Sequence, residues 1–126
     1  MKDRYPPSLY NEIAQGYAKV TIQTVALVNG GAMVAVASQL PVIYQLSLTS
    51  AAIWSMYLWG AGLLLACLAG MFGFFSARHV AEDDLASSNI YLRLGLIAVI
   101  ISILAFATGA IRLAIAFSHL PSGLLN

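Results

Sequence analysis

The sequence has few charged residues and a single cysteine. Only 9% of its 126 residues are charged and 60% are hydrophobic, whereas about 25% of residues are charged in an ordinary soluble domain. So much apolar surface on so short a chain would drive association in water, which excludes an ordinary soluble protein. The formal net charge of +1 provides no strong field, so no nucleic-acid partner is expected. The lone Cys67 excludes an internal disulfide, and its apolar surroundings predict a small buried residue.

The sequence also lacks the motifs of common catalytic sites. It has no Gly-rich phosphate loop, no paired membrane histidines for haem and no Ser/His/Asp set on one side of a membrane. His79 is followed by Glu82, Asp83 and Asp84, but no second ligand-rich cluster completes a metal site, and we interpret this segment as a solvated acidic loop. We therefore expect no cofactor, no metal and no enzymatic activity.

Three long apolar stretches dominate the chain, at residues 20–40, 51–77 and 90–118. Each reaches the length of about 20 residues that a helix needs to cross about 30 Å of hydrocarbon. They lack the alternation of membrane β-strands and exceed their length, whereas helices satisfy their own backbone hydrogen bonds in lipid. The sequence predicts an all-α integral membrane protein, with residues 1–126 forming one membrane domain of three transmembrane helices.

The segments around these spans have distinct predicted roles. Residues 1–19 predict a cytoplasmic amphipathic helical arm, residues 78–89 a cytoplasmic loop and residues 119–126 an outer tail. Capping residues precede the second and third spans: Thr49, Ser50, Ser87, Ser88 and Asn89. A cleaved signal peptide of 37 residues, ending in Ala35-Val36-Ala37, is the alternative for the first span, but Glu12 and Asn29 are unusual in such a segment.

Basic residues indicate the orientation in the membrane. Lys2, Arg4 and Lys19 precede the first span, Arg78 and Arg93 flank the loop at 78–89, and residues 41–50 carry no charge. Because cytoplasmic flanks are enriched in lysine and arginine, we expect a cytoplasmic N-terminus and an outer C-terminus. Aromatic belts agree with this orientation, the outer one with Trp54, Tyr57 and Trp59 and the inner one with Tyr17 and Tyr91.

Small residues gather on one face of every span at 100° per residue. Close approach at such residues holds membrane helices together, because little hydrophobic force acts between them in lipid. The predicted helix-packing residues are Ala26, Gly30, Gly62, Ala66, Ala69, Gly73, Gly95, Ala98, Ser102, Ala105 and Gly109. Most of them are expected to pack within the chain, and the remainder to bind further copies or another membrane protein.

Three polar residues in the spans form the candidate site. Gln23 and Asn29 are expected to form interhelical hydrogen bonds, with a polar path for an ion or solute as the alternative. Arg112 should lie near the outer interface and face helices more than lipid. Its alternatives are lipid phosphates, an anionic ligand or a carboxylate of another protein, because every acidic residue of the chain is expected on the cytoplasmic side.

Short glycine-bearing motifs carry a resemblance to a known group of proteins. The run from Val28 to Ala37, with its Asn-Gly-Gly-Ala segment, resembles the first span of small bacterial three-span membrane proteins, and Tyr57–Leu63 and Phe106–Gly109 resemble their later spans. The resemblance implies the same topology, in the bacterial inner membrane, and transfers no catalytic or ligand residue.

These features favour a non-enzymatic membrane protein that acts through association. It would be an accessory subunit of a membrane complex or a homo-oligomer in the lipid bilayer. The alternatives are a holin-like pore-former and a small oligomeric channel lined by Gln23 and Asn29. Holins commonly end in a charged cytoplasmic tail, whereas the segment after Arg112 contains no lysine or arginine.

Overall fold

The computed structural model describes residues 7–82 and 84–120, without the side chains of residues 7–11, 13, 14 and 81. Its elements are the helices α1 (Pro7–Ser38), α2 (Leu40–Gln45), α3 (Thr49–Ala81) and α4 (Leu85–Ser118), and the described residues include no strand. Three stretches are long and apolar enough to cross a membrane: Gln15–Ser38, Thr49–Val80 and Leu85–Ser118. The prediction of an all-α fold with three membrane helices is confirmed.

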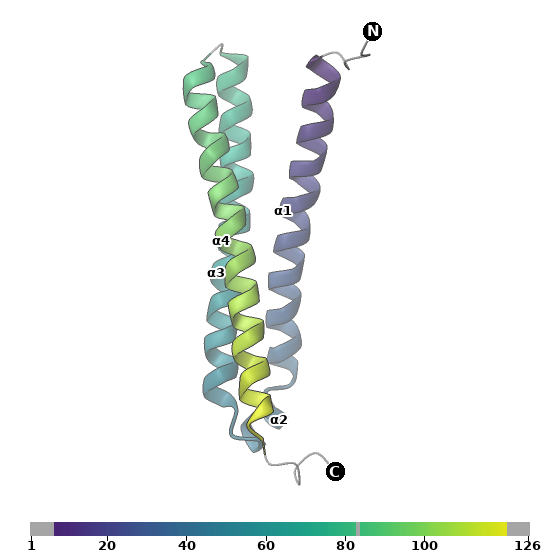
Figure 1. Ribbon diagram of the computed structural model, residues 1–126, viewed down its shortest axis with the longest axis vertical. Helices are drawn as coiled ribbons and strands as arrows, with labels where there is room; N and C mark the ends of the chain where they lie inside the picture. The colour runs from purple at the N-terminus through teal and green to yellow at the C-terminus, as the bar shows by residue number, and fades with distance from the viewer. Residues whose placement is uncertain (1–6, 83, 121–126) are drawn as a thin grey trace.

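The bundle consists of a helical hairpin and one leaning helix (Figure 1). Helices α3 and α4 run antiparallel and side by side along their whole length, whereas α1 approaches them toward α2 and leans away toward its own N-terminus. The short helix α2 lies at one end of the bundle, and the turn between α3 and α4 lies at the other. We call these the α2 end and the turn end.

The helix boundaries differ from the predicted segments in two places. The helix α2 occupies part of the segment 41–50 that was expected to be a plain connection, whereas the described part of the arm continues unbroken into the first span as α1, as expected. The predicted loop at 78–89 contracts to residues 82–84, because α3 continues to Ala81 and α4 begins at Leu85. The N-cap of α4 is Asp84, whose side chain accepts a hydrogen bond from the Ser87 backbone N–H at 3.1 Å, so the predicted serine caps are wrong.

The turn between α2 and α3 has a helix-ending geometry that usually requires glycine. Ser47 adopts a φ of 59°, its N–H donates to the Tyr44 carbonyl, and the Leu48 N–H donates to the Ile43 carbonyl. This pair of bonds is the Schellman motif, and the accompanying contact between Ile43 and Leu48 is buried. The same cluster includes Ala52, with side chains of α1 and α4 packed against it, so the motif joins all helices at the α2 end.

The hairpin contact combines small residues with hydrogen bonds from side chains to backbone carbonyls. Ala66, Ala69 and Ala98 are buried where α3 and α4 approach each other. Toward the α2 end, the Ser55 hydroxyl donates to the Gly109 carbonyl at 2.8 Å, and the Trp59 indole N–H donates to the Phe106 carbonyl at 3.1 Å. Each bond removes a polar side-chain group from lipid, which matters because unpaired polar groups in hydrocarbon cost several kcal/mol.

We predict that Gly109→Ala destabilises the hairpin. A Cβ at Gly109 would lie 2.6 Å from the Trp59 indole nitrogen, so the ring would have to move and its bond to Phe106 would break. The expected loss is about 1–3 kcal/mol of unfolding free energy, the usual cost of overpacking. The measurement is reversible unfolding of the purified protein by SDS titration from mild detergent.

Gly70→Ala is the matched control, because a Cβ at Gly70 on α3 would have no neighbour within 4 Å. Alanine is the better helix former, so this variant should be as stable as the wild type or more stable by up to about 1 kcal/mol. Equal stability of Gly109→Ala and the wild type would contradict the close approach of Trp59 to Gly109.

Candidate functional site

Asn29 occupies a polar centre between the three long helices. Only 1% of its surface is exposed, and its Nδ2 donates to the Val25 carbonyl of α1 at 2.9 Å and to the Ser102 hydroxyl of α4 at 3.3 Å. Ser102 in turn donates to the Gly62 carbonyl of α3 at 2.6 Å. This chain of bonds links α1, α4 and α3 in the apolar region and fixes where α1 docks on the hairpin.

Gly62 makes room for the Asn29 carboxamide. A Cβ on Gly62 would overlap the Asn29 side chain, with its Cγ 2.8 Å away. The Asn29 Oδ1 is buried and accepts no hydrogen bond within the described part of the chain. It instead faces the Gly62 position where a Cβ would stand, and a Cα–H group there is a weak donor common at helix–helix contacts.

The predicted packing residues fall into three groups by exposure. Gly62, Ala66, Ala69, Ala98, Ser102 and Gly109 are buried, and Ala26, Gly30, Gly95 and Ala105 are half-buried. Gly73 differs from the prediction, since it is exposed and a Cβ there would meet nothing within 4 Å. Cys67 is exposed as well, contrary to the expected burial. Both residues face away from the neighbouring helices. Residue spacing alone does not define the rotation of α3 about its axis precisely enough to predict this.

Gln23 differs from its predicted role as an interhelical hydrogen-bonding residue. It lies on α1 between Lys19 and the Asn29 centre, it is exposed, and its side chain forms no hydrogen bond with any described residue. The physical reason is the rotation of α1 about its axis: Ile22, Val25 and Ala26 pack against the hairpin, so Gln23 lies on the face that points away from it. The structure therefore does not bring Gln23 and Asn29 together on one path.

Arg112 faces outward, contrary to the expectation that it faces helices. It is exposed near the α2 end of α4, and its Cζ lies 5.7 Å from the centroid of the Trp54 ring on α3, a cation–π distance. Trp54 also contacts the exposed Tyr57 edge-on, at 6.1 Å between ring centroids. Trp59 does not join this aromatic belt as predicted, because only 3% of it is exposed and it packs between α3 and α4.

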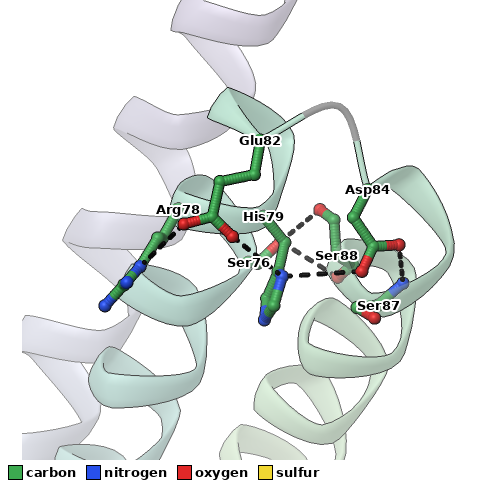
Figure 2. A network of polar contacts seen from close by, with 7 residues as sticks. All are labelled: Ser76, Arg78, His79, Glu82, Asp84, Ser87 and Ser88. Carbon is green, nitrogen blue, oxygen red and sulfur yellow. Dashed lines mark hydrogen bonds and ion pairs between the residues drawn. The ribbon is translucent and has the colours of Figure 1, made fainter.

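A second polar cluster connects α3 and α4 at the turn end (Figure 2). The buried hydroxyls of Ser76 and Ser88 lie 2.9 Å apart, and Ser76 also reaches the Ser88 carbonyl at 3.1 Å. The His79 Nδ1 lies 3.7 Å from Glu82 Oε2 and 3.6 Å from Asp84 Oδ2. Sequence reasoning missed the serine pair, since single serines in apolar helices carry no signal of which neighbour they will meet.

The turn cluster has the character of a helix-capping site. The side chain and then the backbone N–H of Ser87 donate hydrogen bonds that lower the pKa of the Asp84 carboxyl below its usual range, and His79 adds a smaller attraction. The His79 ring stacks on Tyr91 at 5.2 Å between centroids, with an angle of 6°. In residues 7–82 and 84–120, no group of three or more His, Cys, Asp or Glu side chains is arranged to hold a metal ion.

We predict that Gly62→Ala destabilises the protein only when Asn29 is present. In the wild-type background the added methyl group should displace the Asn29 carboxamide and lower the unfolding free energy by about 1–3 kcal/mol. In an Asn29→Ala background the same change should cost at least about 1 kcal/mol less, because the clash has been removed. SDS titration of the four proteins in this double-mutant cycle measures the coupling, and additive effects would contradict the contact.

The lowered pKa of Asp84 predicts a pH dependence at the turn end. A carboxyl whose pKa falls on folding contributes stability above its unfolded pKa, here near 3.8, and loses it as the pH falls through the folded value. Protection factors for the Ser87 amide, measured by hydrogen exchange, should therefore decrease below about pH 3.8 in the wild type. Asp84→Asn should abolish this decrease, and the same acid profile in both proteins would contradict the assignment.

The comparisons with known proteins add no relative. Neither protein-family models nor curated proteins nor solved structures match the chain. The resemblance of the segment from Val28 to Ala37 to small bacterial three-span proteins therefore stays a prediction. The buried Asn29 centre, the exposed Gln23 and the exposed Arg112 are the residues on which a function can be argued.

Proposed function

We propose that this chain is a non-enzymatic membrane protein that acts through association, as an accessory subunit of a membrane complex or as a homo-oligomer. The observation that carries the proposal is the exposed Gln23, on the face of α1 that points away from the hairpin. A glutamine amide facing hydrocarbon lacks water to bond with, so its free energy falls when a partner helix supplies a donor and an acceptor.

The surroundings of Gln23 are open to a partner along the same stretch of helix. The described side chains from Gln15 to Thr21 are all exposed, and the large ones include Tyr17 with 73% of its surface exposed and Val20 with 60%. Ile22, Val25 and Ala26 pack against the hairpin, whereas Gln23 lies on the opposite face of α1, which no described residue covers. Association at this stretch would complete a three-helix contact that the chain leaves partly open.

The orientation proposed for this protein is a cytoplasmic N-terminus and an outer C-terminus in the bacterial inner membrane. Arg78 and Arg93 belong to the turn end, where the N-terminal part of α1 with Lys19 also lies. The enrichment of cytoplasmic flanks in basic residues supports assigning the turn end to the cytoplasm. The partner surface around Gln23 then lies in the cytoplasmic half of the bilayer.

A holin-like pore or an oligomeric channel has less support. Asn29 is enclosed by three helices of the same chain, and its Nδ2 donates hydrogen bonds to the Val25 carbonyl and the Ser102 hydroxyl. Its side chain is therefore not exposed to line a path between copies of the chain. Controlled overexpression distinguishes the two functions. Abrupt lysis or loss of membrane potential would favour a pore, whereas growth with an intact potential accords with association.

We predict that Gln23→Leu weakens association without destabilising the chain. The variant removes one amide-mediated contact between helices, worth about 1–2 kcal/mol in membrane peptides, and the dissociation constant should rise about 5–30-fold. Complex mass and composition are measured after affinity purification from the native membrane in mild detergent. They also distinguish a homo-oligomer from a complex with another membrane protein.

Gln45→Leu provides the matched control, since Gln45 is also an exposed glutamine but ends α2 at the opposite end of the bundle. It should leave the complex unchanged. SDS unfolding should give the same stability for Gln23→Leu and the wild-type monomer, because Gln23 bonds to no described residue. A complex of wild-type mass and affinity in Gln23→Leu would remove the basis of the proposal.

A further inference from the structure

Among the residues that the structure describes, Arg112 is a cation with no carboxylate at its end of the bundle. The carboxylates in the described residues, Glu12, Glu82 and Asp84, all lie on segments at the turn end. Residues 38–58 and 105–126, which include α2 and the adjoining parts of α3 and α4, contain no aspartate or glutamate at all. The guanidinium therefore has the Trp54 ring on one side and no described carboxylate at its end of the bundle, so its N–H donors are open to an anion from outside the chain.

The depth of Arg112 coincides with the expected level of lipid headgroups. Arg93 and Arg112 are both exposed on α4, and their separation of 19 residues corresponds to a rise of about 28 Å. That distance is close to the thickness of about 30 Å of a bilayer's hydrocarbon core. If Arg93 marks one boundary, Arg112 with Trp54 and Tyr57 marks the other, where phosphates are the abundant anions and where aromatic side chains gather.

A shallow, open surface on α4 lies beside Arg112. It is lined by Thr108, Ile111, Arg112 and Ile115 along one face of the helix. The apolar side chains of this lining suit the glycerol and upper acyl region of a lipid, and Arg112 is the group that suits its phosphate.

We propose that Arg112, Trp54 and the adjoining apolar face of α4 form a binding site for an anionic phospholipid. The guanidinium donates bidentate hydrogen bonds to the phosphodiester oxygens, the geometry in which arginine exceeds lysine. The Trp54 ring holds the guanidinium by its face and leaves the outward N–H groups available. An anionic headgroup is favoured over a zwitterionic one because a choline or ethanolamine cation would be repelled by Arg112. The site is independent of the proposed partner surface at Gln23.

The two tryptophans of the chain supply a direct test. The full-length protein is reconstituted in phosphatidylcholine vesicles that contain a small, equal fraction of either dibrominated phosphatidylglycerol or dibrominated phosphatidylcholine, and tryptophan quenching is recorded. Trp54 is 54% exposed and should report a lipid at the site, whereas Trp59 is 3% exposed. A Trp54→Phe protein gives the Trp59 background to be subtracted.

Brominated phosphatidylglycerol should occupy the site about fivefold more than brominated phosphatidylcholine in the wild type, the preference expected from one arginine near a membrane surface. Arg112→Gln should remove the preference, and Arg93→Gln, an exposed arginine on the same helix, should keep it. Equal quenching of wild-type Trp54 by the two lipids overturns the proposal without any variant. Retention of the preference in Arg112→Gln, or its loss on addition of inorganic phosphate to the vesicles, also overturns a lipid site formed by Arg112.

Discussion

Pairing of polar groups inside hydrocarbon is the constraint on which this bundle depends. Helices satisfy their backbones, but the hydroxyl of Ser55, the indole of Trp59 and the hydroxyl of Ser102 have no water to bond with. Each donates to a backbone carbonyl of the facing helix, and small residues let the two backbones approach closely enough for those bonds. The result is the tight α3–α4 hairpin. The hydrogen bonds form only where the backbones lie close together, and the bonds in turn hold the backbones close.

The docking of α1 is a consequence of this hairpin. Ser102 is held by the Gly62 carbonyl, and this orientation presents its oxygen to the Asn29 Nδ2. Gly62 supplies both the carbonyl and the space beside it, so one residue serves the hairpin and the third helix. Because α1 is anchored near Asn29 and at the α2 end, its remaining turns have no comparable polar contact and lean away.

The sequence predicts the parts of this fold that depend on composition and length. Three apolar runs define three membrane helices, and the small-residue periodicity identifies Gly62, Ser102 and Gly109 as interface positions. Spacing does not define how far each helix rotates about its axis, which explains why Gln23, Gly73 and Arg112 face outward against expectation. Residue spacing also does not predict that the Trp59 indole donates to the Phe106 carbonyl inside the hairpin. A tryptophan near the end of an apolar run looks the same in the sequence whether it is buried or exposed.

The polar residues left unpaired within one chain differ in what could satisfy them. The Gln23 amide is neutral and lies along the span, so a complementary amide, hydroxyl or carbonyl on another helix satisfies it. Arg112 is charged and lies near the hydrocarbon boundary, where a phosphate satisfies it without any protein partner. Asn29 is already paired within the bundle. The three candidate residues therefore differ in environment: Asn29 is an internal anchor, whereas Gln23 is proposed to meet another helix and Arg112 a lipid headgroup.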